Sequence, residues 1–252
     1  MSRKYALIGV EGPHDLAFLS KVLKLLKFQA FDGKESNLDP FWAKFKPTYP
    51  KKGGNLYERL DMPAIYYTDN LSVAIYAGGG SNLAKLLLAI LANHTPYKQE
   101  IVAFGIIADA DQDSPNKIAQ EYSGKFQVYF PQFPTVGGKV DTDYPRTGIY
   151  VLPDNIKQGV LENILHSCGH SAYPVHMEKA ESYLAEFDAE HKLDWKPFDH
   201  QKALIATVVS VLKPGKTNTV SIKDNNWISE DTCSQVPALE KFVEFIKQLL
   251  DI

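Results

Sequence analysis

IVAFGIIADADQD, residues 101–113, joins an unbroken apolar run to three closely spaced aspartates. A short apolar run with a defined end is typical of a strand buried inside a sheet. Asp109, Asp111 and Asp113 follow the run directly, and carboxylates this close to one another repel. Hard divalent cations such as Mg²⁺ prefer oxygen ligands and relieve that repulsion. The sequence therefore predicts a buried strand that ends at a metal site.

A second acidic motif follows another apolar run near the start of the chain. Residues 5–10, YALIGV, predict a strand, and EGPHD, residues 11–15, comes directly after it. Pro13 suits the first turn of a helix, and Asp15 suits the positive end of the helix dipole. On its own this motif is also compatible with a simple strand-to-helix turn. Together with the aspartates, Glu11 and Asp15 favour a shared metal site.

The rest of the chain alternates between strand and helix patterns. Further strands are expected at 71–77, 126–130, 148–152 and 219–222, and helices at 16–28, 83–92, 116–123, 159–167, 176–191, 200–212 and 237–250. This alternation predicts an α/β fold with a mostly parallel, Rossmann-like sheet and helices on both faces. We expect residues 1–170 to form the catalytic domain, with an irregular insertion at about 29–70. Residues 171–252 are expected to form a mainly helical C-terminal extension packed on that domain.

Composition limits the class of protein without identifying its function. The 252 residues are 44% hydrophobic, which is typical of a globular protein with a full core. The sequence contains no secretory signal and no apolar stretch near the roughly 20 residues that span a bilayer. Cys168 and Cys233 lack metal-type spacing, so we expect reduced cysteines in a cytoplasmic protein. The net charge of −3 does not by itself indicate nucleic acid.

Two other patterns bear on phosphate and nucleic-acid binding. The turn GGGS, which comprises Gly78, Gly79, Gly80 and Ser81, precedes a predicted helix. Its backbone N–H groups can bind a phosphate, although a tight strand-to-helix connection accounts for it equally well. Lys44, Lys46, Lys51 and Lys52 alternate with aromatic residues in WAKFKPTYPKK, residues 42–52. Such a segment suits single-stranded nucleic acid, and a packed insertion with solvated lysines is the alternative.

The order of these elements resembles the Toprim domain of topoisomerases, bacterial primases, RecR-type repair proteins and OLD nucleases. The matching motifs are EGPHD at 11–15 and DAD at 109–111, and the resemblance covers roughly residues 5–168. AGGGSNL at 77–83 resembles the OLD branch. GIYVLPDN at 148–155, followed by GVLE at 159–162, resembles a block of compact, poorly characterised Toprim proteins. No Gly-x-x-x-x-Gly-Lys-Ser/Thr loop is present in the sequence.

The resemblance implies a Toprim-like catalytic domain that binds Mg²⁺ or Mn²⁺. Glu11, Asp109 and Asp111 correspond to its central metal ligands, and Asp15 is similar to the second acid of the OLD-type first motif. Asp113 and Glu162 are further candidate ligands. The candidate for the late lysine of OLD-type nucleases, which lies near the scissile phosphate, is Lys202. Whether Glu11 holds a metal or acts as general base stays open.

These parts predict metal-dependent hydrolysis of nucleic-acid phosphodiesters, with DNA favoured over RNA. Phage defence and DNA repair are the expected settings, and a regulatory protein partner would restrain such a nuclease. One alternative is a non-catalytic Toprim module that binds nucleic acid or a protein. Another is a nucleotide-sugar transferase, which uses Asp-x-Asp to hold a metal but gives no reason for Glu11 and Asp15.

Overall fold

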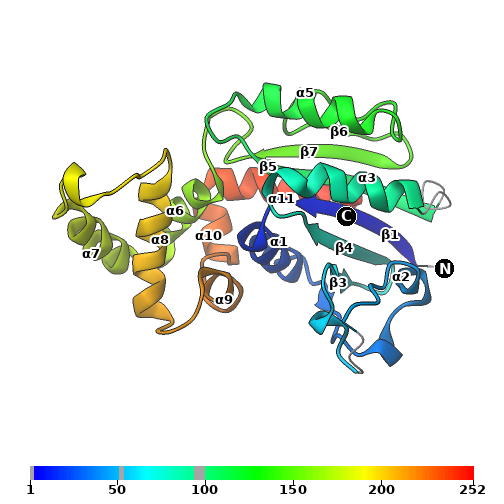
Figure 1. The fold of residues 1–252 in the computed structure, drawn as a ribbon, viewed down its shortest axis with the longest axis horizontal. Helices are drawn as coiled ribbons and strands as arrows, with labels where there is room; N and C mark the ends of the chain where they lie inside the picture. The colour runs from blue at the N-terminus through cyan, green and yellow to red at the C-terminus, as the bar shows by residue number, and fades with distance from the viewer. Residues whose placement is uncertain (1–2, 51–53, 94–99) are drawn as a thin grey trace.

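A computed structural model describes residues 3–50, 54–93 and 100–252 of the chain, and its centre is one sheet (Figure 1). The strands are β1 (Lys4–Val10), β2 (Gln29–Ala30), β3 (Ala64–Tyr67), β4 (Leu71–Ala77), β5 (Ile101–Asp109), β6 (Val140–Asp141) and β7 (Arg146–Leu152). Their order across the sheet is β2-β3-β4-β1-β5-β7-β6. The four central strands are parallel, and the strands toward both edges are antiparallel. The predicted α/β fold with a mostly parallel sheet is confirmed.

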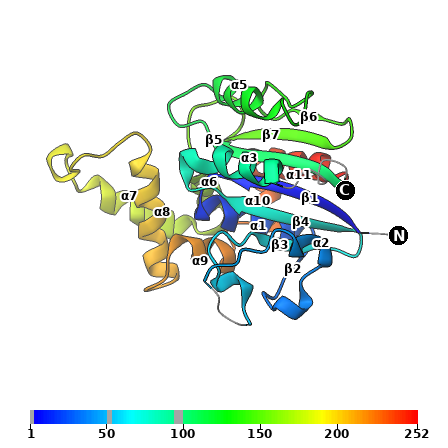
Figure 2. The same cartoon turned by 45° about the vertical axis from the view of Figure 1, so that its right-hand side comes forward.

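Helices cover both faces of this sheet. They are α1 (Pro13–Leu25), α2 (Pro40–Ala43), α3 (Leu83–Asn93), α5 (Pro115–Phe126), α6 (Leu161–Ala172), α7 (Pro174–Ala185), α8 (Asp199–Leu212), α9 (Asn218–Asp224), α10 (Glu230–Gln235) and α11 (Pro237–Leu250). Side chains alternate along a strand, so Leu7 packs with α3 and α5, while Ile8 packs with α1 and α11. Figures 1 and 2 show α3 in front of the sheet and α11 behind it. No helix of the described residues combines the length and apolar character needed to cross a bilayer.

The C-terminal third contributes to two parts of the molecule. In Figure 1, α7 and α8 stand at the left, away from the sheet, whereas α11 returns to lie against it. On α11 the ring of Phe242 is fully buried, 4.8 Å from the ring of Phe18 and 5.0 Å from that of Tyr150. Cys168 on α6 and Cys233 on α10 are free thiols. The last helix is thus part of the core beneath the sheet.

The segment expected to be irregular at about 29–70 is mostly loops and short helices where the structure describes it, but strands near its two ends extend the sheet. Within it, β2 and β3 add antiparallel strands beside β4. Trp42 is buried, and its Nε1 donates a hydrogen bond to Ser72 Oγ at 2.8 Å. The many aromatic residues of this segment therefore cover an edge of the sheet, which their irregular spacing did not indicate.

Two predicted short strands are helical or turn structure. Residues 126–130 end α5 and turn, because the rings of Phe126 and Phe130 pack 5.1 and 4.6 Å from Phe104. Residues 219–222 lie in α9, where the hydroxyl of Thr217 accepts a hydrogen bond from Val220 N. A capping threonine of this kind favours a helix start even in a β-branched sequence.

We predict that Phe242→Ala lowers the free energy of unfolding by about 3–5 kcal/mol, because it empties a site that packs against the rings of Phe18 and Tyr150. Urea denaturation measures this change. Lys241→Ala is the matched control, since Lys241 is exposed on the same helix and its loss should change stability by less than ~0.5 kcal/mol. Equal stability of the two variants would show that α11 does not hold the sheet together.

Candidate functional site

Acidic side chains that lie far apart in the sequence line one pocket of about 230 Å³. The residues around it are Glu11, Gly12, Pro13, His14, Asp15, Gly80, Asp109, Glu162 and Lys202. The strand register explains why they meet. Val10 pairs with Ala77 on one side and with Ile107 on the other, so β4, β1 and β5 end side by side. The pocket lies where these parallel strands end, which is where ligands bind in open α/β sheets.

Two helices begin at the pocket and direct backbone N–H groups toward its carboxylates. The carboxylate of Asp15, in the first turn of α1, accepts a hydrogen bond from Gly12 N at 2.7 Å. At the start of α6, Leu161 N donates to Asp109 Oδ1 at 3.0 Å. Helix N-termini carry partial positive charge, so both helices stabilise negative charge at this position.

Side chains from two other helices complete the pocket. Tyr122 of α5 donates its hydroxyl to Glu11 Oε1 at 3.4 Å. His14 Nδ1 lies 3.2 Å from Glu162 Oε1, and Glu162 is only 5% exposed. Lys202 reaches the pocket from α8 and brings a positive charge among the acids. Carboxylates, an imidazole and a lysine therefore share a single cavity.

Burial and mutual repulsion raise the pKa values of three acids of the cluster, Glu11, Asp15 and Asp109. Burial, together with the charges of Asp15 and Asp111, raises the pKa of Glu11 to about 7. Burial also raises the pKa of Asp15 and of Asp109, and neighbouring carboxylates add to both shifts. The hydrogen bond to Glu162 raises the pKa of His14. The cluster carries more negative charge than its own protein groups neutralise.

The donor set fits a hard divalent cation that keeps part of its water shell. All four acids of the pocket offer oxygen, as Mg²⁺ and Mn²⁺ prefer. Among the described residues, two groups bring three ligand atoms within 4.8 Å of one another, and this acid cluster is not one of them. Mg²⁺ is usually bound through one or two carboxylates, with waters and substrate phosphates as its other ligands. The pocket suits that mode better than a closed protein cage.

Asp111 and Asp113 do not line the pocket, although the sequence grouped them with Asp109. Asp111 has a φ of 49° and is exposed, and its backbone pairs with Gly159. In an extended chain Asp109 and Asp111 would point to the same side, because side chains alternate along a strand, and the left-handed conformation of Asp111 ends that alternation. Asp113 lies 2.8 Å from Lys117 in a surface ion pair. Their roles as ligands stay predictions.

The glycine turn contributes one residue to the pocket. Gly80 lines it, and its N–H donates to the carbonyl oxygen of Glu11 at 2.8 Å. Gly79 and Gly80 both have a φ of 67°, where glycine is favoured. A side chain at Gly78 would collide with the backbone of Leu83, so this glycine is needed for packing. Ser81 is exposed outside the pocket.

The lysine-rich segment lies away from the acids. Asp39, which caps α2, contacts Arg3 at 3.1 Å just before β1, and the pocket follows the other end of that strand. Lys44 lies 3.4 Å from Glu100, and Lys46 forms an ion pair with Glu35. Lys51 and Lys52 lie outside the described residues. A nucleic-acid contact by this segment would therefore be separate from the acidic pocket.

The family described as "Protein of unknown function (DUF3226)" matches residues 5–251. The chain belongs to the DUF3226 family. It is similar in fold to the hypothetical protein PH0156 from Pyrococcus horikoshii OT3, at 16% identity and a TM-score of 0.56, over 98% of this chain and 95% of that one. The C-terminal region of the Xanthomonas campestris pv. campestris OLD protein aligns at 14% identity and a TM-score of 0.41, over 98% and 94% of the two chains. None of the curated proteins matches the chain.

Two residues of this DUF3226 site had no role assigned from the sequence. His14 stood inside the first acidic motif, and its place between Glu11 and Asp15 was the available signal. Tyr122 is separated by 111 residues from its partner Glu11 and resembles any aromatic residue of an amphipathic helix. Only the packing of α5 beside β7 and α3 brings Tyr122 to the acids.

We predict that the metal-free protein loses stability as the pH rises from about 5 to about 8. The raised pKa of Glu11 means that, between its ordinary value of 4.5 and about 7, the folded protein holds a proton that the unfolded chain releases. Raised pKa values at Asp15 and Asp109 act in the same direction. Thermal denaturation in the presence of a chelator measures this loss.

The Asp109→Asn variant should be more stable than the original protein at about pH 8 and similar to it at about pH 5. The amide cannot ionise, yet its oxygen can still accept the hydrogen bond from Leu161 N. Asp113→Asn is the control, because a surface ion pair contributes little. A pH-independent stability, or an Asp109→Asn protein that is no more stable at pH 8, would contradict the description of this cluster.

Proposed function

We propose that this protein is a Mg²⁺- or Mn²⁺-dependent nuclease that hydrolyses phosphodiesters, with DNA favoured over RNA. One observation carries the proposal. Glu11 and Asp109, at the ends of adjacent parallel strands, line one pocket with Lys202 from a distant helix. Acids and a lysine combined in this way suit a metal ion and an anionic substrate together.

Glu11, Asp15 and Asp109 are the residues that would hold the metal, and Glu162 is near enough to join them. A divalent metal at this position polarises a phosphoryl oxygen and lowers the pKa of a bound water. Asp111 is exposed just beyond the pocket, and its charge acts on Glu11 and on Asp109. We therefore keep Asp111 as a candidate ligand for a metal that bridges to substrate.

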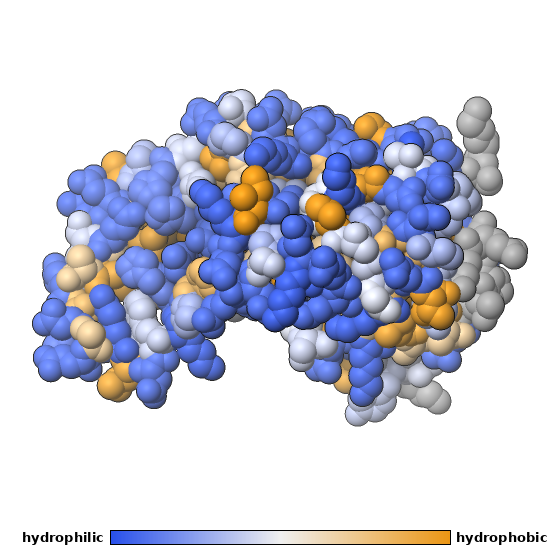
Figure 3. Space-filling view, turned by 90° about the horizontal axis from the view of Figure 1, so that it is seen from above, coloured by the Kyte–Doolittle hydropathy of each residue, from blue (hydrophilic) through white to orange (hydrophobic). Residues whose placement is uncertain are grey.

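The other groups of the pocket have distinct tasks in this proposal. Lys202 contacts a non-bridging phosphate oxygen and neutralises charge that develops during the displacement. Gly80 borders the position where that phosphate would lie. Glu162 holds His14 through Nδ1, which leaves Nε2 as the ring atom to exchange a proton with the leaving oxygen. The face of the molecule seen in Figure 3 is mainly hydrophilic.

The Toprim resemblance supports the same reaction, since its first motif supplies Glu11 and its second supplies Asp109. The nucleotide-sugar transferase is less well supported. That activity gives no reason for Glu11 and Asp15, which line the pocket together with Asp109. Phage defence or DNA repair, with a restraining protein partner, remains the setting we propose.

We predict that the protein cleaves DNA in Mg²⁺ or Mn²⁺ and that a chelator stops the reaction. Glu11→Gln and Asp109→Asn should each lower the rate by at least about 100-fold, because losing even an outer partner of a metal ligand typically lowers activity by 10–100-fold. Gel assays with single- and double-stranded DNA and RNA measure the cleavage.

Glu178→Gln is the matched control, since Glu178 is an exposed acid on α7 that does not border the pocket. It should cleave at the original rate. Undiminished cleavage by Asp109→Asn would reject the proposed site. Nucleic-acid binding without cleavage, in either metal, would support the non-catalytic module instead.

Lys202→Ala should lower the cleavage rate by about 100-fold, as does the loss of one group that stabilises developing charge. The affinity for Mn²⁺ should not fall, because lysine is not a metal ligand and its positive charge repels a cation in the same pocket. Titration calorimetry gives that affinity. Lys179→Ala, at an exposed position on α7, is the control. Full activity of the Lys202→Ala variant would show that Lys202 takes no part in cleavage.

A further inference from the structure

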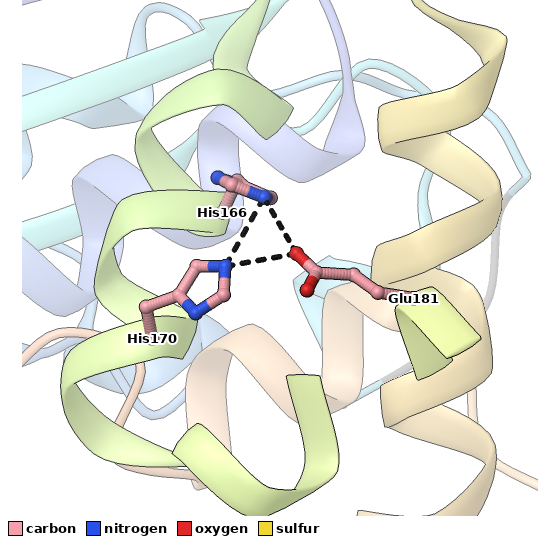
Figure 4. A group of neighbouring side chains, drawn as sticks. All are labelled: His166, His170 and Glu181. Carbon is pink, nitrogen blue, oxygen red and sulfur yellow. Dashed lines mark hydrogen bonds and ion pairs between the residues drawn. The ribbon is translucent and has the colours of Figure 1, made fainter. Parts of the chain in front are cut away.

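A second cluster of metal-ligating side chains lies between α6 and α7, away from the acidic pocket. His166 and His170 project from α6 toward Glu181 of α7 (Figure 4). The two Nε2 atoms are 3.3 Å apart, and Glu181 Oε1 lies 3.2 Å from His166 Nε2 and 2.9 Å from His170 Nε2. Three potential ligand atoms therefore form a nearly equilateral triangle.

The size of this triangle matches a first coordination shell. Ligands placed about 2.0–2.1 Å from Zn²⁺ at tetrahedral angles stand about 3.3 Å from one another. An ion centred on this triangle, about 1 Å above its plane, would contact all three atoms at ordinary zinc distances. At least one further position would stay open to water, because the three side chains remain 38–43% exposed.

Hydrogen bonding alone accounts poorly for the arrangement. Both imidazoles direct Nε2 at the same oxygen of Glu181, and also at each other. If both Nε2 atoms carried hydrogens to reach Glu181, those hydrogens would crowd one another. If one did not, its lone pair would face a carboxylate oxygen. A cation at the centre satisfies all three atoms at once.

The scaffold holds the triangle in place. Two histidines four positions apart lie on one face of a helix and present their rings together. The two helices are joined only by Tyr173, and a side chain at Gly169 would collide with Met177, so α6 and α7 pack closely beside the cluster. Ligands on two closely packed helices require little ordering when a metal binds.

We propose that His166, His170 and Glu181 bind Zn²⁺, which fastens α6 to α7. Imidazole nitrogen favours zinc over Mg²⁺, which prefers all-oxygen sites. The bound ion braces the helical part of the molecule that completes the acidic pocket. Glu162 begins the same helix α6, and α8, which carries Lys202, contacts both α6 and α7. The zinc site shares no ligand with the acidic pocket. The zinc proposal can therefore be tested independently of the nuclease proposal.

Zinc binding to the full chain is measured by calorimetry in excess Mg²⁺, which occupies the all-oxygen pocket. We expect one zinc ion per chain, and a higher thermal midpoint when zinc is added. His166→Gln, His170→Gln and Glu181→Gln should each weaken binding by a factor on the order of 100, since each removes a direct ligand. His176→Gln is the control, because His176 is a histidine of α7 outside the triangle.

The visible absorption of bound Co²⁺ provides a second measurement, which reports on the identity of the ligands rather than on the affinity. Co²⁺ bound by two imidazoles and a carboxylate should give visible absorption bands that His176→Gln keeps and His170→Gln loses. The ligands are half-exposed, so the variants should fold, and circular dichroism checks that they do. Failure of the original protein to take up zinc in excess Mg²⁺ overturns the proposal, as does binding by all three ligand variants as tight as the original. Neither result bears on cleavage at Asp109.

Discussion

The parallel pairing of β1 with both β4 and β5 is the constraint on which the site depends. It brings Glu11, Asp109 and the glycine turn to the same edge although nearly 100 positions separate the two acids. Any shift of this register by one residue would turn Glu11 to the other face of the sheet. The buried side chains that set the register, such as Ile8 and Ile107, therefore also position the acids.

Gathering carboxylates in a pocket costs electrostatic and desolvation free energy, and hydrogen bonds from the surrounding groups offset only part of that cost. The N–H groups at the starts of α1 and α6, the hydroxyl of Tyr122 and the imidazole of His14 each contact one acid. Hydrogen bonds to a charged group contribute about 1.5–3 kcal/mol each. Even so, the pKa of Glu11 stays raised, so negative charge remains in excess. The divalent cation that we propose for this pocket would neutralise that excess.

The sequence predicted the parts of this site that depend on local pattern. The central strands follow unbroken apolar runs, and helix α11 has the bounds that its periodicity indicated. Contacts between distant segments could not be read in the same way. His14 and Glu162 are 148 residues apart, and the positive φ of Asp111 interrupts an apparently extended motif. Side-chain alternation is reliable inside a paired strand and fails here at Asp111, two residues beyond the end of β5.

The two candidate metal sites differ in the chemistry of their ligands, and one helix connects them. The four acids of the pocket beside Asp109 offer oxygen, whereas two of the three ligand atoms in the triangle at His166 are nitrogen, so the first site would favour a hard cation and the second a borderline one. Helix α6 begins at the first site with Leu161 and carries the histidines about one and a half and two and a half turns later. A rigid helix transmits displacement along its axis. Fastening its later turns to α7 therefore limits the movement of the N–H group that holds Asp109.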